Sequence, residues 1–224
     1  MSSITTKAIV LSRVNYGEAD RIMQLITPEN GKVSVIAKGV RRERSKLAGG
    51  IELLAICDVT IHQGKGELGI VTSARLDTFF SHILQDYDRL QFAYYVLKDI
   101  SKASELLSET EFFDLAQETL SSLNTATIPL EIIDTWYRLQ MAILLGVGIN
   151  LSTDGNGMKL VEDARYRFDV DDMAFVYDER GNYTSEHIKL LRVMSAQNPR
   201  VIAQITSASE LLETGYLIGR IAHE

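Results

Sequence analysis

The spacing of apolar residues changes from a period of two to a period near 3.6 at about residue 80. The earlier part indicates short strands, which lie at about residues 6–14, 20–27, 32–39, 53–63 and 67–76. The fourth run alternates most clearly, with an apolar residue at every second position from Ala55 to Ile61. About five antiparallel strands in so short a stretch are too few for an immunoglobulin-type sandwich, and they fit a small closed barrel of the oligonucleotide-binding (OB) type.

The later part of the chain indicates helices, which lie at about residues 86–103, 108–123, 129–146, 185–197 and 207–222. Between the third and fourth of them, a turn-rich stretch at about 150–184 contains two short strand-like runs. We therefore expect an α+β chain, with an OB-fold barrel over residues 1–80. A helical domain over residues 81–224, carrying the turn-rich insert, completes the expected domain organisation.

Cysteine usage and hydropathy limit the kinds of protein that fit. Cys57 is the only cysteine, so the sequence has neither a disulfide framework nor a thiolate cluster for zinc. The longest apolar run, residues 141–149, is about half as long as a membrane span. The first residues lack the basic and apolar regions of a signal peptide. These features predict a cytoplasmic protein without membrane contact.

Positive charge is concentrated in one short stretch of an acidic chain. The net charge is −7, divided as +3 over residues 1–80 and −10 over the remainder. Residues 38–46, "KGVRRERSK", hold five cations against the single acid Glu43. We call this stretch the basic segment, and its cations are Lys38, Arg41, Arg42, Arg44 and Lys46.

The basic segment has two interpretations. Charged runs in loops are often only solvated, and composition alone leaves that interpretation open. Position favours nucleic-acid binding, because the segment joins the third and fourth strands of a barrel type whose faces and loops bind oligonucleotides. Its cations would then neutralise phosphates and release counterions, whatever the base sequence. Further candidate DNA-binding residues in the barrel are the possible stacking ring Tyr16 and the cations Arg13, Arg21, Lys32 and Arg75.

Catalytic and cofactor motifs are weak in this sequence. Residues 64–69, "GKGELG", have the glycine spacing of a dinucleotide-binding turn, but a β-like run follows where that motif needs a helix. The aspartates near residue 170 lack the spacing of a calcium loop. We expect no enzyme activity, no cofactor and no metal. A nucleotide-using enzyme of DNA metabolism and a protein-only scaffold that has lost DNA contact remain the alternatives.

Residues 7–50 read "KAIVLSRVNYGEADRIMQLITPENGKVSVIAKGVRRERSKLAGG". They resemble the start of the RecO family of bacterial recombination mediators, which share a "YGE.D.I" turn, an "LTPE.GK" hairpin and a "KG.R+..SK..G" segment. The residues on this pattern are Tyr16, Gly17, Glu18, Asp20, Pro28, Gly31, Lys32, Lys38, Gly39, Arg41, Arg42, Ser45, Lys46 and Gly50. A weaker likeness at residues 137–151 looks like the helix ahead of the family's zinc-finger-like insert.

The resemblance implies a non-enzymatic protein of recombinational DNA repair in the RecF-type pathway. Such a protein binds single- and double-stranded DNA, anneals complementary strands, and acts with RecR and the tail of single-strand-binding protein to load RecA. Many relatives carry four cysteines in the insert, whereas residues 151–176 of this chain contain none, so the zinc is not carried over. Turns and local apolar packing then have to hold the insert together.

Overall fold

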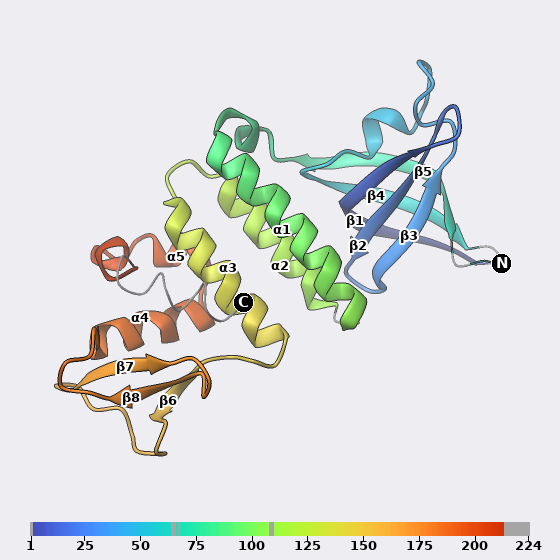
Figure 1. Cartoon of the computed structure of the whole chain (residues 1–224). Helices are drawn as coiled ribbons and strands as arrows, with labels where there is room; N and C mark the ends of the chain where they lie inside the picture. The colour runs from blue at the N-terminus through green and yellow to red at the C-terminus, as the bar shows by residue number, and fades with distance from the viewer. Residues whose placement is uncertain (1, 64–65, 67, 108–109, 213–224) are drawn as a thin grey trace. The chain divides into compact units, whose positions relative to one another are not determined.

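Strands β1 to β5 close into a barrel (Figure 1). Their bounds are β1 (Ser2–Tyr16), β2 (Asp20–Thr27), β3 (Gly31–Ala37), β4 (Ala55–Gln63) and β5 (Gly69–Phe79). The hydrogen-bonded order is β1-β2-β3-β5-β4, and β1 pairs with β4 to close the barrel. β3 and β5 run parallel, whereas the other pairs are antiparallel. This arrangement confirms the expected five-stranded OB-type barrel.

The computed structural model describes residues 2–63, 66, 68–107 and 110–212. The chain divides into two compact units, Met1–Asn124 and Thr125–Glu224. The barrel shares the first unit with the two helices that follow it. The domain boundary expected at about residue 80 stays a prediction.

Strand β1 is fifteen residues long because it pairs with two different strands. Its first half pairs with β4 and its second half with β2, so that Ile9 lies opposite both Ile26 and Ile56. A shift in register between Val10 and Ser12 supplies the local bend that a strand needs to follow a barrel wall. Strand β1 thus links β2 to β4 and closes the barrel.

The barrel interior is filled by aliphatic side chains from all five strands and from the β3–β4 connection. The buried members are Ala8, Val10, Met23, Leu25, Val35, Ala37, Val40, Ile51, Ala55, Cys57, Val59, Ile61 and Val71. The inward-facing residues of β4 are the alternating ones that the sequence predicts. Val40 and Ile51 belong to the β3–β4 connection, so this connection is packed against the barrel at both of its ends.

Gly50 ends a short 3-10 turn, η1 (Ala48–Gly50), in the β3–β4 connection. A Cβ atom at this position would collide with the backbone carbonyl of Ala74 in β5. Only glycine lets the two backbones approach this closely. The connection therefore lies directly against the barrel wall at this point.

Two helices cover one side of the barrel in the first unit (Figure 1). After a 3-10 turn, η2 (Ser81–Gln85), come α1 (Tyr87–Leu106) and α2 (Glu111–Leu123). The Asp86 side chain accepts two of the free N–H groups in the first turn of α1, those of Asp88 and Arg89, and so fixes where this helix begins. Both helices contact β1 and β3. The outward-facing Ile9 and Ile26 are fully buried for this reason.

The second unit combines helices with a small sheet. Its elements are α3 (Leu130–Leu144), β6 (Asn150–Asp154), β7 (Arg165–Asp169), β8 (Ala174–Tyr177), β9 (Tyr183–Thr184), α4 (Ser185–Ala196) and α5 (Pro199–Ile202). The sheet order is β6-β8-β7-β9. Helix α3 is joined to the C-terminal end of α4 by hydrogen bonds from Gln140 to the carbonyl of Met194 in the last turn and from Trp136 to the carbonyl of Gln197 just after it.

Aromatic rings form the core of the small sheet. Phe175 is fully buried and makes edge contacts with Tyr166, Phe168 and Tyr183, with ring centres 5.4 to 6.3 Å apart. The turn after β6 is held by Asp154, whose Oδ1 accepts from the backbone N–H groups of Asn156 and Met158. Turns and apolar packing therefore hold this small sheet together.

The expected elements agree with the structure to within a few residues in most cases. The five barrel strands and the helices expected at 86–103, 108–123, 129–146 and 185–197 are confirmed, although residues 108–109, at the expected start of the second helix, lie outside the described residues. The strand expected after the glycine-rich stretch is β5, although part of that stretch, residues 64–65 and 67, lies outside the described residues. The helix expected at 207–222 is seen at residues 208–212, and its remainder lies outside them.

The insert contains four short strands, whereas its sequence pattern indicates two runs. β9 has only two residues, and β6 is defined by its pairing with β8. Neither strand therefore shows an alternation of apolar residues that could be recognised in the sequence. Among the described residues, no three His, Cys, Asp or Glu side chains come together as a possible metal site. The likeness of this insert to a zinc finger stays a prediction. None of the helices that the structure describes is long and apolar enough to cross a membrane.

We expect the second unit to lose stability as pH falls below about 6.5, because of His187 at the start of α4. Its Nδ1 accepts the Thr184 N–H at 3.1 Å in a capping box, so it has to be unprotonated. Burial lowers the pKa of His187 below its ordinary value of 6.5, although the charge of Glu186 acts weakly against this. The unfolded chain therefore takes up the proton first, and stability present above pH 6.5 is lost below it.

Thermal melting between pH 7.5 and 5 tests this expectation, with a slope of at most about 1.4 kcal/mol per pH unit from one group. His187→Gln keeps a capping-box side chain at the same position but cannot titrate. This variant should lose much of the pH dependence. Glu162 and Asp169 do not interfere, because the pKa of each is lowered from an ordinary value already below 5. An equal pH dependence in His187→Gln would contradict the prediction.

Candidate nucleic-acid interface

The base of the basic segment is fixed to the turn between β1 and β2. The Gly39 N–H donates to Oδ1 of Asp20 at 2.7 Å, and the Arg41 N–H donates to the carbonyl of Ala19 at 2.9 Å. Between them Val40 is 3% exposed and packs into the barrel core. Gly39 has a φ of 65°, a conformation that glycine adopts without strain. Three consecutive residues therefore anchor the segment.

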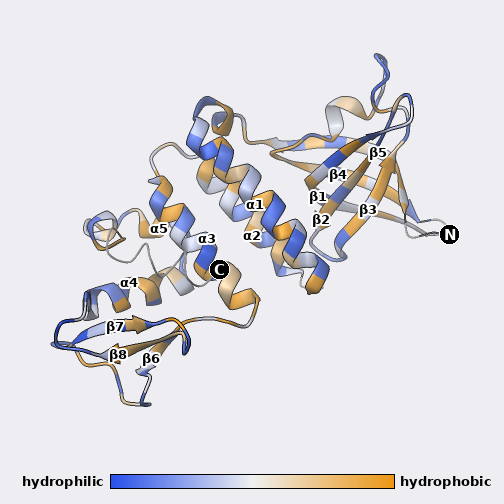
Figure 2. Cartoon of the chain, viewed as in Figure 1, coloured by the Kyte–Doolittle hydropathy of each residue, from blue (hydrophilic) through white to orange (hydrophobic). Residues whose placement is uncertain are grey.

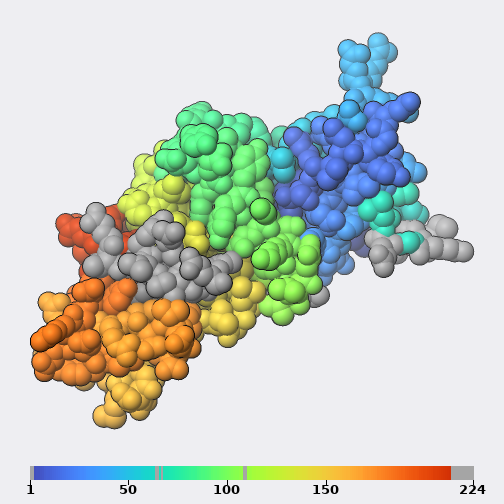
Figure 3. All heavy atoms as spheres, in the orientation of Figure 1, coloured from blue at the N-terminus to red at the C-terminus, as the bar shows by residue number. Residues whose placement is uncertain are grey.

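Beyond this anchor the segment consists of turns that project into solvent. Backbone bonds from Arg42 to Gly39 and from Ser45 to Arg42 shape it. Figure 3 shows it as a light-blue projection from the barrel, and Figure 2 shows that its tip is hydrophilic. All five cations are exposed. Within the part of the chain that the structure describes, no carboxylate forms an ion pair with any of them.

An exposed aromatic and apolar strip lies beside the basic segment. Tyr16 and Val14 are 56% and 66% exposed and point to the same side of β1, two residues apart. Tyr16 pairs with Asp20, which holds the base of the segment. Arg21 pairs with Ala37, the residue before Lys38, and its Nε donates to Asn15 Oδ1. This end of the barrel therefore combines cations with a ring on which a base can stack.

Lys32 lies at the other end of β3 and is bonded to helix α1. Its Nζ donates to the carbonyl of Ser101 at 2.7 Å and to Glu105 at 2.8 Å, and its side chain is 13% exposed. The hydrogen bond from Lys32 holds the pKa of the Glu105 carboxyl below its ordinary value. β3 has seven residues, so roughly 20 Å of strand separates Lys32 from the basic segment.

Arg13 and Arg75 are also paired with acids. Arg13 Nη1 is 3.0 Å from Glu52, and Arg75 Nη2 is 2.7 Å from Asp58. The hydrogen bond from Arg75 is the main reason that the pKa of the Asp58 carboxyl lies below its ordinary value. Their charges are therefore partly compensated within the barrel, unlike those of the basic segment.

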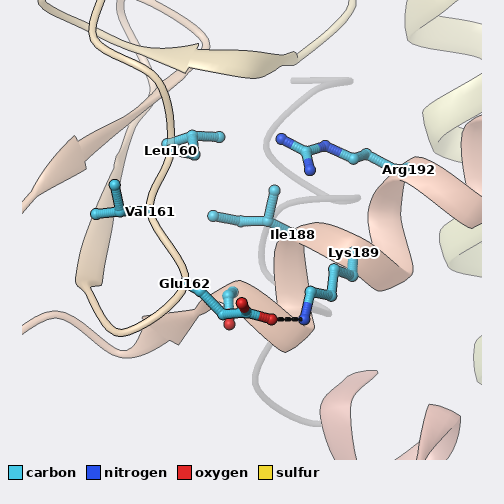
Figure 4. Close-up of a pocket in the computed structure, with 7 residues that line it drawn as sticks. Leu160, Val161, Glu162, Ile188, Lys189 and Arg192 are labelled. Carbon is cyan, nitrogen blue, oxygen red and sulfur yellow. Dashed lines mark hydrogen bonds and ion pairs between the residues drawn. The ribbon is translucent and has the colours of Figure 1, made fainter.

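A small pocket in the second unit offers a contrast (Figure 4). Its volume is about 210 Å³, and it lies between the chain before β7 and the first turns of α4. Lys189 at its edge contacts Glu162 at 2.6 Å and Glu186 at 3.0 Å, while Arg192 donates twice to the carbonyl of Leu151. Both cations that line it are therefore already bonded to groups of the chain, unlike those of the basic segment.

The sequence of the barrel is similar to that of known proteins. Residues 1–80, which contain the whole barrel, match the family model "Recombination protein O N terminal". The barrel thus matches the N-terminal domain of the RecO family. Proteins named "DNA repair protein RecO" are 31% identical over 146 residues in Rubrobacter xylanophilus, 33% over 137 in Acetivibrio thermocellus and 33% over 125 in Dehalococcoides mccartyi.

The matches cover 65%, 59% and 55% of this chain, respectively. They cover 58%, 53% and 49% of the three relatives. The chain thus spans about half the length of the curated RecO relatives it matches. The family resemblance seen in residues 7–50 is confirmed, and it lies in the barrel that carries the basic segment.

The predicted site residues of this RecO-like barrel fall into two groups. The basic segment, Tyr16 and Arg21 share one end of the barrel, whereas Lys32 lies at the far end of β3, and Arg13 and Arg75 are paired with acids. Whether any of them contacts DNA stays a prediction. Sequence reasoning assigned no role to Asp20 or Val40, which anchor the segment. An acid at the start of a strand, next to a turn, was the available signal for Asp20.

Proposed function

We propose that this chain binds single- and double-stranded DNA and anneals complementary strands in recombinational repair. One observation supports it most: five exposed cations project from an OB-type barrel on an anchored segment, without ion pairs to the described residues. The names of the RecO relatives support the repair role. We also propose that the protein is cytoplasmic and has no enzyme activity. It would act with RecR and the tail of single-strand-binding protein to load RecA.

The mechanism is electrostatic. Phosphates bound at the basic segment release their counterions, which favours binding without base specificity. Tyr16 and Val14 lie beside the segment and offer a surface for unpaired bases, which a paired duplex cannot use. Neutralising two strands lowers their mutual repulsion, so that complementary strands can approach and pair.

Binding of a labelled single-stranded oligonucleotide at several salt concentrations tests the proposal. We expect affinity to fall steeply, with a logarithmic slope of roughly −2 to −4 for about three to five phosphate contacts. The same protein should speed the pairing of two complementary labelled strands. Absence of binding at low salt, or a slope near zero, would show that the basic segment is only a solvated loop.

A further inference from the structure

Asp20 is an acid at the foot of the basic segment, yet its carboxylate forms no ion pair with the segment's cations among the described residues. Its Oδ1 instead accepts the backbone N–H of Gly39 at 2.7 Å. A carboxylate near guanidinium groups commonly forms charge-assisted pairs with them. Here the acid holds the chain and leaves the cations uncompensated.

This hydrogen bond determines how the segment leaves the barrel. Gly39 is in the left-handed region of backbone conformation, and the next two residues are held by burial of Val40 and by the bond from Arg41 to Ala19. Losing the acceptor at Asp20 frees the first of these three attachments. Lys38, which precedes Gly39, and Arg42, which follows the anchor, then have more freedom.

We propose that Asp20 is a positioning residue of the DNA interface, which fixes the basic segment through the Gly39 N–H without neutralising any of its cations. The consequence for binding rests on the proposed function. A segment already ordered in the free protein binds phosphates without the entropy cost of ordering it. A negative charge at this place repels phosphates, so charge alone would make Asp20 unfavourable there.

Three variants separate position from charge. Asp20→Ala removes both the acceptor and the charge, Asp20→Asn keeps an acceptor oxygen without the charge, and Glu18→Ala removes a charge from the same turn. Glu18 is exposed, and its side chain forms no hydrogen bond or ion pair with the described residues, which makes it the matched control.

We expect Asp20→Ala to bind the labelled single strand about three- to ten-fold more weakly than the parent, with an unchanged salt slope because its cations remain. Asp20→Asn and Glu18→Ala should bind as tightly as the parent, or more tightly. If charge alone mattered, all three variants would gain affinity. Affinity of Asp20→Ala at or above that of the parent would therefore overturn the proposal.

A second readout does not depend on DNA. Amide exchange at Gly39 and trypsin cleavage after Arg41 and Arg42 should be faster in Asp20→Ala than in the parent, Asp20→Asn or Glu18→Ala. If the parent does not bind DNA, the proposed function fails, and the exchange rates alone decide whether Asp20 fixes the segment. If Asp20→Ala unfolds, Asp20→Glu, which keeps the charge but displaces the carboxylate, should give faster exchange and weaker binding. Parent-like exchange in these variants would overturn the proposal.

Discussion

Reversing two charges of the basic segment, with Arg41→Glu/Arg42→Glu, is expected to weaken single-strand binding by about 25-fold or more at 0.1 M salt. Each lost phosphate contact removes a factor of about five at this salt concentration, because the salt exponent for a single strand is about 0.7 per contact. The salt slope should flatten by about 1.4 for two contacts. The loss should be similar for all base sequences, since phosphates carry no sequence information. Annealing should fall with binding.

The fold should survive this double substitution, because both side chains are exposed and the anchor uses the backbone and Val40. Melting temperature checks this. The matched control is Lys98→Glu/Lys102→Glu, which makes the same change of net charge at two exposed positions of α1. The control should bind within a factor of about two to three of the parent. A folded Arg41→Glu/Arg42→Glu protein with parental affinity would show that the basic segment is only a solvated loop, and the DNA surface would have to be sought around Arg13, Arg21, Lys32 and Arg75.

Phe175→Ala is expected to destabilise the second unit by about 3–5 kcal/mol, the usual cost of removing a fully buried ring. The ring contacts three other aromatic rings and lies at the centre of the small sheet. No set of metal ligands among the described residues is available to compensate for its loss. Chemical or thermal unfolding followed by the fluorescence of Trp136, which belongs to the second unit, measures the effect.

Tyr177→Ala provides the control on the same strand, β8. Its ring is more than half exposed and contacts the Tyr166 ring in a T-shaped arrangement, so we expect a cost of about 1 kcal/mol or less. A chelator should leave the melting temperature of the parent unchanged. An equal cost for the two substitutions, or a large effect of the chelator, would show that the aromatic cluster does not hold the insert.

The barrel could be predicted from the sequence because its signals are local. Alternation along residues 55–61 and the turn at residues 28–31 report strand and hairpin within a few positions. The pairing of β6 with β8 could not be predicted in this way. Its partners lie about twenty residues apart and are only four or five residues long, so their register depends on the aromatic core.

The same distinction applies to the candidate site. The basic segment is visible in the sequence because its charges are adjacent. The ion pairs Arg13–Glu52 and Lys32–Glu105 are not visible in the sequence, because their members are 39 and 73 residues apart. Only the closed barrel and the packed helix α1 bring these groups together. Sequence alone therefore could not show which cations outside the basic segment are paired with acids, whereas the structure pairs Arg13, Lys32 and Arg75.

The anchor of the basic segment separates two properties that mutations usually change together. Residues 39–41 attach it through backbone bonds and one buried valine, whereas the side chains of Arg42, Arg44 and Lys46 contribute nothing to that attachment. Substitutions of these three side chains should therefore change the stability of the barrel little, whereas most changes in a small domain are limited by the stability that they cost. A lineage can add or remove cations there one at a time, and so adjust its affinity for polyanions while the barrel stays under separate selection.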